Sequence, residues 1–149
     1  VPMDVDIDLV LAPVDGSDRS ELAAEYAIAV ADRYGADIHL LYVLDQKVAR
    51  GLEVGDVAAT SIAEQQGALT DRVREQLPEG VDLSMSSVPG FSQSRLSQTP
   101  GNVILDAAEE LDADFLIVPR KQPSEEPDEM LGKAALYVLE YASQPVLSV

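Results

Sequence analysis

The chain has 149 residues, 46% of them apolar, so it is long enough to bury a hydrophobic core and too apolar to be intrinsically disordered. It has no cysteine, which excludes disulfide frameworks, cysteine-ligated zinc and thiol catalysis. Its net charge of −17, from 27 acidic and 10 basic residues, argues against nucleic acid and anionic lipid as partners.

The basic residues are skewed, because only three of them are lysines. Excess carboxylate with scarce lysine is typical of proteins from a high-salt cytoplasm, where the Debye length falls to about 3 Å and screens the self-repulsion. No apolar run approaches the roughly 18 residues of a spanning helix, and no basic, apolar leader opens the chain. We therefore expect a cytoplasmic protein, from a halophilic source, that does not insert into a membrane.

The first third of the chain predicts two buried strands with a helix between them. Continuous apolar runs at 9–14 and 38–44 indicate the strands. Between them, apolar residues recur at helical spacing from Asp18, which with Glu21 forms a capping-box pair, as far as Gly35, a natural helix stop.

The middle of the chain predicts a loop, a helix and an edge strand. Gly51 and Gly55 bracket the expected loop, and a helix follows from about Val57 until Pro78 ends it. Residues 81–88 then alternate apolar and polar side chains, as expected for an edge strand with one face in solvent.

The last third predicts two more helices, each followed by a strand. Thr99 and Pro100 supply a cap and a first-turn proline for a short helix, and 115–118 is a buried strand. A final helix begins near Leu131, and 146–149 is a terminal strand. Strands that alternate with helices predict an α/β fold, a parallel sheet with helices on both faces, in a single domain over 1–149.

Four segments together resemble the universal stress protein family. They are Leu9-Val10-Leu11-Ala12-Pro13-Val14-Asp15-Gly16-Ser17, Ile38-His39-Leu40-Leu41-Tyr42-Val43, Ala113-Asp114-Phe115-Leu116-Ile117-Val118 and Gln144-Pro145-Val146-Leu147-Ser148-Val149. The resemblance covers essentially the whole chain. It implies an open five-stranded sheet of order 3-2-1-4-5, of the adenine-nucleotide alpha-hydrolase-like kind, and a dimer formed through the last strand.

That strand order predicts where a ligand binds. Connections leave strand 1 in one direction and strand 4 in the other, so the topological switch point lies between these two strands, and ligands bind there at the carboxyl ends. The candidate ligand-binding residues of this crevice are Asp15, Val43, Arg120, Lys121, Gly132 and Lys133.

The phosphate-binding loop of the family is altered in this chain. Family members that bind ATP carry Gly-x-x-Gly after strand 4 and, further on, Gly-Ser or Gly-Thr. Here Arg120 and Pro123 stand at the two glycine positions, and Gly132-Lys133 replaces Gly-Ser one residue too close. Proline has no N–H to donate, and losing two charge-assisted hydrogen bonds of about 1.5–3 kcal/mol each weakens binding at least a hundredfold. We therefore expect no bound cofactor, ATP and AMP being possible but disfavoured.

Three features have both a functional and a purely structural interpretation. Asp15 either contacts an adenine or ribose or serves as a turn residue, and the altered loop favours the turn. His39, the only histidine, is expected to be a sheet residue without chemistry. The loop 89–99 contains no acidic residue, and either covers a ligand, contacts a protein partner or is simply a polar connection.

The sequence contains no catalytic constellation, so we expect a stress-response or regulatory domain that is not an enzyme, with ATP binding weakened or lost. One alternative is an adenine-nucleotide-binding protein with a phosphate site rebuilt from basic residues, and another is a cytosolic regulatory domain of a membrane transporter. The last strand lacks charge and proline and would leave a sheet edge unpaired, which predicts a homodimer joined through that edge. The edge residues are Val146, Leu147, Ser148 and Val149, with Tyr137 and Tyr141 flanking them.

Overall fold

The computed structural model describes residues 5–55, 58–90, 98–120 and 130–149. These residues form one five-stranded sheet, in which every neighbouring pair of strands is parallel and the order is 3-2-1-4-5, as expected. The strands are β1 (Leu9–Val14), β2 (Asp37–Leu44), β3 (Leu83–Pro89), β4 (Phe115–Val118) and β5 (Val146–Ser148). The helices are α1 (Asp18–Tyr34), α2 (Gln46–Val54), α3 (Ala59–Gln76), α4 (Pro100–Glu110) and α5 (Met130–Tyr141).

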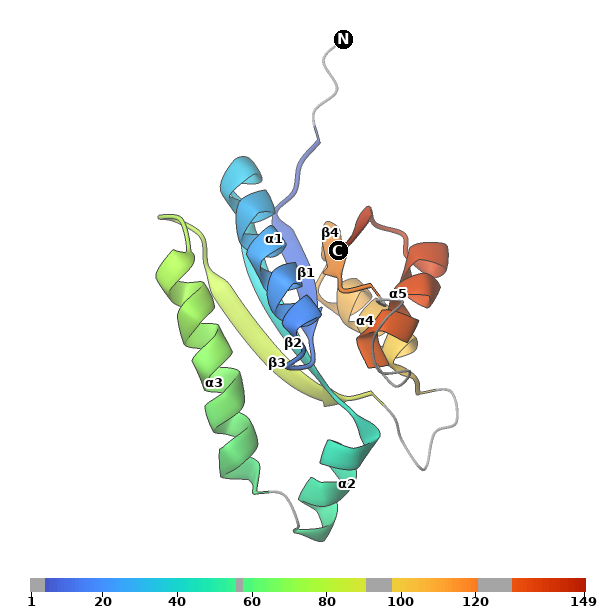
Figure 1. Cartoon of the computed structure of the whole chain (residues 1–149). Coiled ribbons are helices and arrows are strands. Elements are labelled where there is room, and N and C mark those ends of the chain that lie inside the picture. Colours follow the sequence, from blue (N-terminus) through green and yellow to red (C-terminus); the bar gives the residue numbers. More distant parts are fainter. Residues whose placement is uncertain (1–4, 56–57, 91–97, 121–129) are drawn as a thin grey trace.

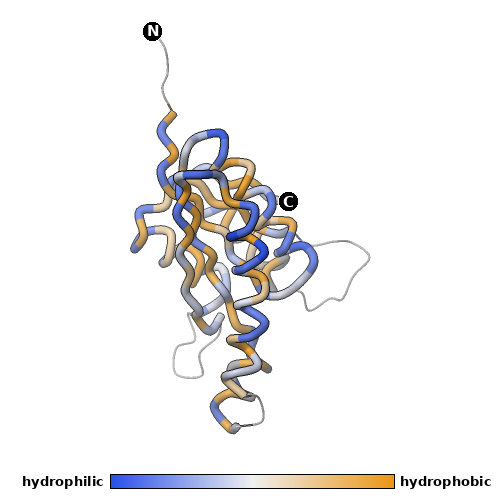
Figure 2. Tube along the Cα trace, turned by 90° about the vertical axis from the view of Figure 1, so that its left-hand side faces the viewer, coloured by the Kyte–Doolittle hydropathy of each residue, from blue (hydrophilic) through white to orange (hydrophobic). Residues whose placement is uncertain are grey.

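Helices cover both faces of the sheet (Figure 1). One core cluster joins α1 and α3 to the sheet and includes Val10, Ala12 and Tyr42, whereas the other joins α4 and α5 to it and includes Leu11 and Leu41. Consecutive residues of a strand point to opposite faces, so β1 and β2 contribute to both clusters. Figure 2 shows the hydrophobic residues gathered along the strands in the interior of the molecule.

Helix α1 approaches the sheet through small residues. Its buried positions are Ser20, Ala23, Ala24, Ala27 and Ala31. Tyr26 and Tyr34 share the helical spacing of the apolar residues, but both are exposed. A face of alanines brings the helix backbone close to β1, and the bulky tyrosines lie outside that contact.

The start of α1 differs by one residue from the expected capping box. Ser17, not Asp18, is the cap, and its Oγ accepts a hydrogen bond from the Ser20 backbone N–H at 3.2 Å. Asp18 and Glu21 lie in the first turn, where their negative charge favours the positive end of the helix dipole. The expected stop at Gly35 is confirmed, with φ of 67°.

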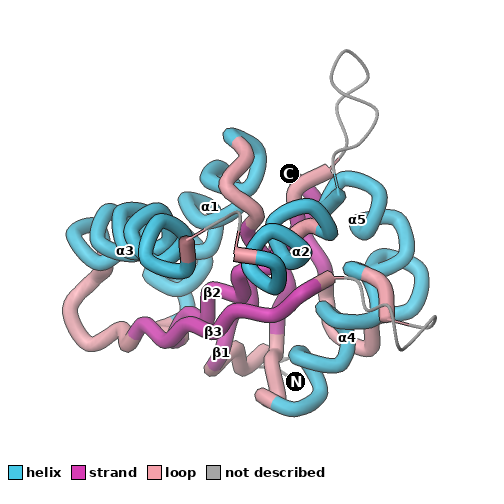
Figure 3. The backbone as a smooth tube through the Cα atoms, turned by 90° about the horizontal axis from the view of Figure 1, so that it is seen from below, coloured by secondary structure: helices cyan, strands magenta, loops and turns pink. Residues whose placement is uncertain are grey.

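The predicted loop between Gly51 and Gly55 was wrong, because this stretch belongs to α2. Asp45 caps that helix by accepting a hydrogen bond from the Val48 backbone N–H at 2.7 Å. Gly51 is buried inside the helix, and Gly55 ends it with φ of 84°, a conformation in which glycine carries no steric penalty. Figure 3 views the sheet toward the carboxyl ends of its strands and shows α2 lying across them, between α3 and α5.

Two helical glycines predict opposite effects of the same substitution. A Cβ at Gly67 in α3 meets no atom within 4 Å, whereas a Cβ at Gly101 in α4 lies 2.6 Å from Cδ1 and 3.1 Å from Cβ of Tyr137 in α5. We expect Gly67→Ala to raise the free energy of unfolding by about 1 kcal/mol and Gly101→Ala to lower it by about 1–3 kcal/mol. Urea denaturation measures the free energy of unfolding of both variants and of the native protein. If both substitutions changed this free energy in the same direction, the close packing of α4 on α5 would be contradicted.

Candidate functional site

A cavity of about 430 Å³ opens at the carboxyl ends of β1 and β2. It lies between these strand ends and helices α1, α2 and α3, on the side of β1 that faces β2. Of the six predicted ligand-binding residues, Asp15 and Val43 line this cavity. The cavity therefore lies beside the crevice expected between β1 and β4 and shares the Asp15 turn with it.

None of the remaining four candidates is among the described residues that line this cavity. Arg120 follows β4, is exposed, and donates its backbone N–H to the Val149 carbonyl at 2.7 Å. Gly132 and Lys133 belong to the first turn of α5. Lys121, Pro123 and the acidic stretch up to residue 129 lie outside the described residues, so the rebuilt phosphate site stays a prediction.

The Asp15 carboxylate is used by the turn that starts α1. Its Oδ1 accepts a hydrogen bond from the Ser17 backbone N–H at 2.9 Å, while its own backbone N–H donates to the Ser20 Oγ at 3.2 Å. Gly16 between them has φ of 87°, in the left-handed region. This is the turn arrangement favoured from the sequence, and it leaves Asp15 half-buried at the rim of the cavity.

The cavity floor holds a neutral hydroxyl network. The Tyr42 hydroxyl donates to the Gln66 carbonyl at 2.8 Å and lies 2.8 Å from Thr70 Oγ1, which also donates to that carbonyl. Burial raises the pKa of Tyr42, and the Thr70 hydrogen bond and the Arg72 charge oppose this only in part. Tyr42 therefore stays protonated, and its hydroxyl anchors α3 to β2.

The charged groups of the cavity are mostly acidic. Glu21 from α1 and Arg72 from α3 form an ion pair at 2.6 Å, and both side chains are about half exposed, so the pair adds little stability. Asp15 and Asp45 add two carboxylates, so the described lining residues include three acidic groups and one guanidinium, which is already paired. A ligand with several negative charges meets repulsion here.

His39 is more engaged than the sequence indicated. It is 6% exposed, and its Nδ1 and Nε2 lie 2.7 and 2.8 Å from the hydroxyls of Ser84 and Ser86. Burial lowers the pKa of His39. The signal was present in the alternation of β3, which puts both serines on one face opposite His39 and Leu41 of β2.

Most of the acid-free loop 89–99 lies outside the described residues. Its described ends are held by Gln98, whose Nε2 donates to the Pro89 carbonyl at 2.9 Å, and by Thr99, whose Oγ1 accepts from the Asn102 backbone N–H at 3.3 Å. Thr99 thus caps α4 as the sequence predicted.

The model of the universal stress protein family matches residues 7–149. The chain belongs to this family. A universal stress protein of Methanocaldococcus jannaschii is 27% identical over 144 residues, which cover 94% of this chain and 80% of that relative. Within the described residues, none of the helices is both long and apolar enough to span a membrane.

Solved structures of universal stress proteins share the fold. UspA from Lactobacillus plantarum is 21% identical, with a TM-score of 0.73 over 98% of this chain and 99% of that one. A universal stress protein solved in complex with cAMP gives 0.69 at 22% identity over 97% of both chains. One from Archaeoglobus fulgidus in complex with dAMP gives 0.61 at 19% identity, over 97% of this chain and 98% of that one.

The lowered pKa of His39 predicts how stability depends on pH. Because the folded pKa lies below the unfolded value of about 6.5, the unfolded chain binds more protons as the pH falls below 6.5, and the folded state loses stability. Between the two pKa values, we expect the free energy of unfolding to fall by up to about 1.4 kcal/mol for each pH unit because of His39. The His39→Gln variant lacks this contribution.

Denaturation of both proteins from pH 7 to pH 5 isolates this contribution, because the carboxylates titrate in both. Parallel curves for His39→Gln and the native protein would show that burial does not depress the pKa of His39.

Proposed function

We propose that this universal stress protein acts as a regulatory, stress-response protein without catalysis, and that its binding of ATP is weakened or lost. The observation that carries this proposal is the acidic lining of the strand-end cavity. Asp15, Glu21 and Asp45 line it, and Arg72, the one guanidinium among its described lining residues, is paired with Glu21. A triphosphate that enters this cavity meets the carboxylates of Asp15, Glu21 and Asp45.

The sequence after β4 supports the same conclusion. Arg120 and Pro123 occupy the positions of the two loop glycines of the ATP-binding relatives described above. A proline cannot donate a backbone hydrogen bond, and a side chain at the other position keeps phosphate oxygens from close approach to the backbone.

A second candidate function is binding of an adenine nucleotide through a rebuilt phosphate site. The relatives solved with cAMP and dAMP favour it, since both ligands carry one phosphate group. A single phosphate needs fewer donors than a triphosphate, and Arg120, Lys121 and Lys133 supply positive charge on the segments that flank the end of β4. Val43 and Val48 add apolar surface to the cavity for a base.

We further propose a homodimer through β5, in a high-salt cytoplasm. Among the described residues, β5 pairs with β4 on one side only, and no described strand pairs with its other edge. Apolar side chains of the adjacent α5 are also exposed, among them Leu136, which is 75% exposed, and Tyr141. Pairing of two β5 edges about a twofold axis provides hydrogen-bond partners for the backbone groups of β5 and covers part of the apolar surface of α5.

Titration calorimetry tests the nucleotide proposal. We expect ATP to bind with a dissociation constant above about 100 μM in molar salt, because the missing backbone donors remove several kcal/mol of phosphate binding even where salt screens the acidic lining. Low-micromolar binding of ATP would overturn the proposal. Micromolar binding of AMP or cAMP without ATP binding would favour the second candidate.

Light scattering of Leu147→Lys tests the dimer. Two lysines facing each other across the twofold axis repel, so we expect the variant to be monomeric where the native protein is dimeric. Leu147 also packs against the core next to α1, so a melting curve must show that the variant is folded. Tyr141→Glu, on the exposed face of α5, is a second variant that we expect to weaken the dimer. A native protein that is monomeric would contradict the proposal.

A further inference from the structure

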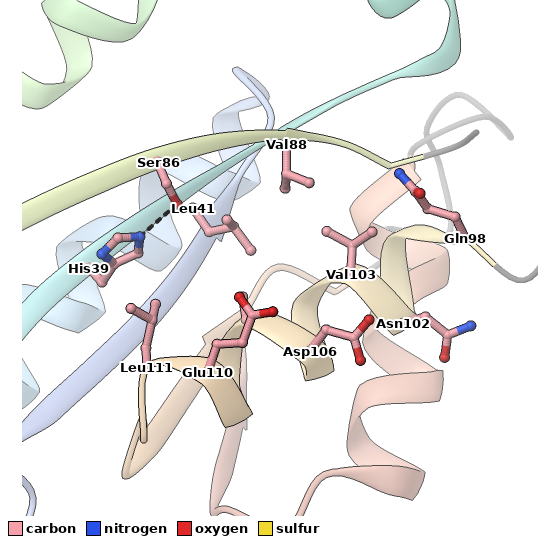
Figure 4. Close-up of a pocket in the computed structure, with 11 residues that line it drawn as sticks. His39, Leu41, Ser86, Val88, Gln98, Asn102, Val103, Asp106, Glu110 and Leu111 are labelled. Carbon is pink, nitrogen blue, oxygen red and sulfur yellow. Dashed lines mark hydrogen bonds between the residues drawn. The ribbon is translucent and has the colours of Figure 1, made fainter. Parts of the chain in front are cut away.

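A second cavity, of about 460 Å³, lies between α4 and the β2–β3 edge of the sheet (Figure 4). It shares no lining residue with the strand-end cavity and contains none of the six predicted ligand-binding residues. The core on this face of the sheet joins α4 and α5 to β1, β2 and β4, whereas the cavity is lined by residues of α4, β2 and β3. Cavities of this size hold small organic molecules in other proteins.

The sheet side and the inner face of α4 make the cavity largely apolar. Leu41 and Val88 contribute from β2 and β3, and Val103 and Leu111 contribute from α4 and the residue after it. Figure 4 shows these side chains facing one another across the space. Such walls bind a hydrocarbon body by removing it from water.

The charge of the cavity comes from two carboxylates on one wall. Asp106 and Glu110 are one helical turn apart on α4, and both line the cavity. Figure 4 shows the Glu110 carboxylate directed toward the strands. Among the residues that the structure describes, neither carboxylate takes part in an ion pair.

The opposite wall adds no positive charge. His39 lines the cavity, but both its ring nitrogens are engaged by serine hydroxyls and burial favours its neutral form. The other described lining residues include no arginine and no lysine. Among its described lining residues, the cavity therefore combines a largely apolar surface with two carboxylates and no cation, which favours a cationic ligand over an anionic one.

We propose that this cavity binds an organic amine with an apolar body. The ammonium group donates hydrogen bonds to Asp106 and Glu110, and the hydrocarbon part packs against Leu41, Val88 and Val103. This ligand class is opposite in charge to the nucleotides discussed for the strand-end cavity. Neither proposal depends on the other.

The first experiment follows backbone amide signals by NMR while n-hexylammonium is added. A salt concentration of about 1 M screens unspecific attraction to the acidic surface. Two controls separate the contributions of the charge and the hydrocarbon chain. Methylammonium has the charge without the hexyl chain, and n-hexanol has the hexyl chain without the charge.

We expect saturating shifts confined to α4 and the facing residues of β2 and β3, with binding at least about tenfold tighter than for either control. Equal binding of n-hexanol would overturn the role of the carboxylates. Shifts that spread over the surface without saturating would overturn the site.

The second experiment repeats the titration on Asp106→Asn/Glu110→Gln. Both side chains are exposed, so the variant keeps the core intact, and we expect it to bind n-hexylammonium about tenfold more weakly. Glu109→Gln is the matched control, because Glu109 is an exposed acid of the same helix that does not line the cavity. Equal weakening in the control would show a general charge effect and contradict the proposal.

Discussion

The structure depends on the pairing of β1 with two parallel neighbours. Strand β1 is almost wholly buried, and it forms ladders with β2 on one side and β4 on the other. Chain connections therefore run away from β1 in both directions, and helices must cover both faces of the sheet. The loops that follow β1 and β4 separate at one end, where ligands bind in folds of this kind.

The alternation of side chains along β2 positions both cavities. Tyr42 points toward α3 and anchors the floor of the strand-end cavity, while His39 and Leu41 point toward α4 and line the second cavity. Residues of β2 thus line two separate cavities. Among the described lining residues of both cavities, acidic side chains outnumber basic ones.

The sequence predicted the fold well because strands in this sheet are buried on both faces. Continuous apolar runs therefore marked β1, β2 and β4, and alternation marked the edge strand β3. The order of the strands came from the family resemblance, since local patterns carry no information on pairing. Helix α2 was missed because glycine usually indicates a loop, whereas here Asp45 caps the helix and Gly51 is tolerated inside it.

The candidate site was predicted only in part. Asp15 and Val43 line the same cavity because Asp15 follows β1 and Val43 lies near the carboxyl end of the neighbouring β2. Glu21 and Arg72 were missed, since an ion pair between α1 and α3 depends on how two helices pack and leaves no local signal. The partnership of His39 with two serines of β3 likewise required the register between β2 and β3.

Whether this protein has lost the phosphate site is tested by comparing the binding of adenosine with that of ATP, because the two ligands differ only in the phosphates. We would measure both dissociation constants by NMR, at low and at molar salt, from the signals of residues around the strand-end cavity. We expect ATP to bind no tighter than adenosine, and its affinity relative to adenosine to improve as salt screens the carboxylates. Binding of ATP ten times tighter than adenosine, or more, would contradict the loss of ATP binding, because it would show a working phosphate site.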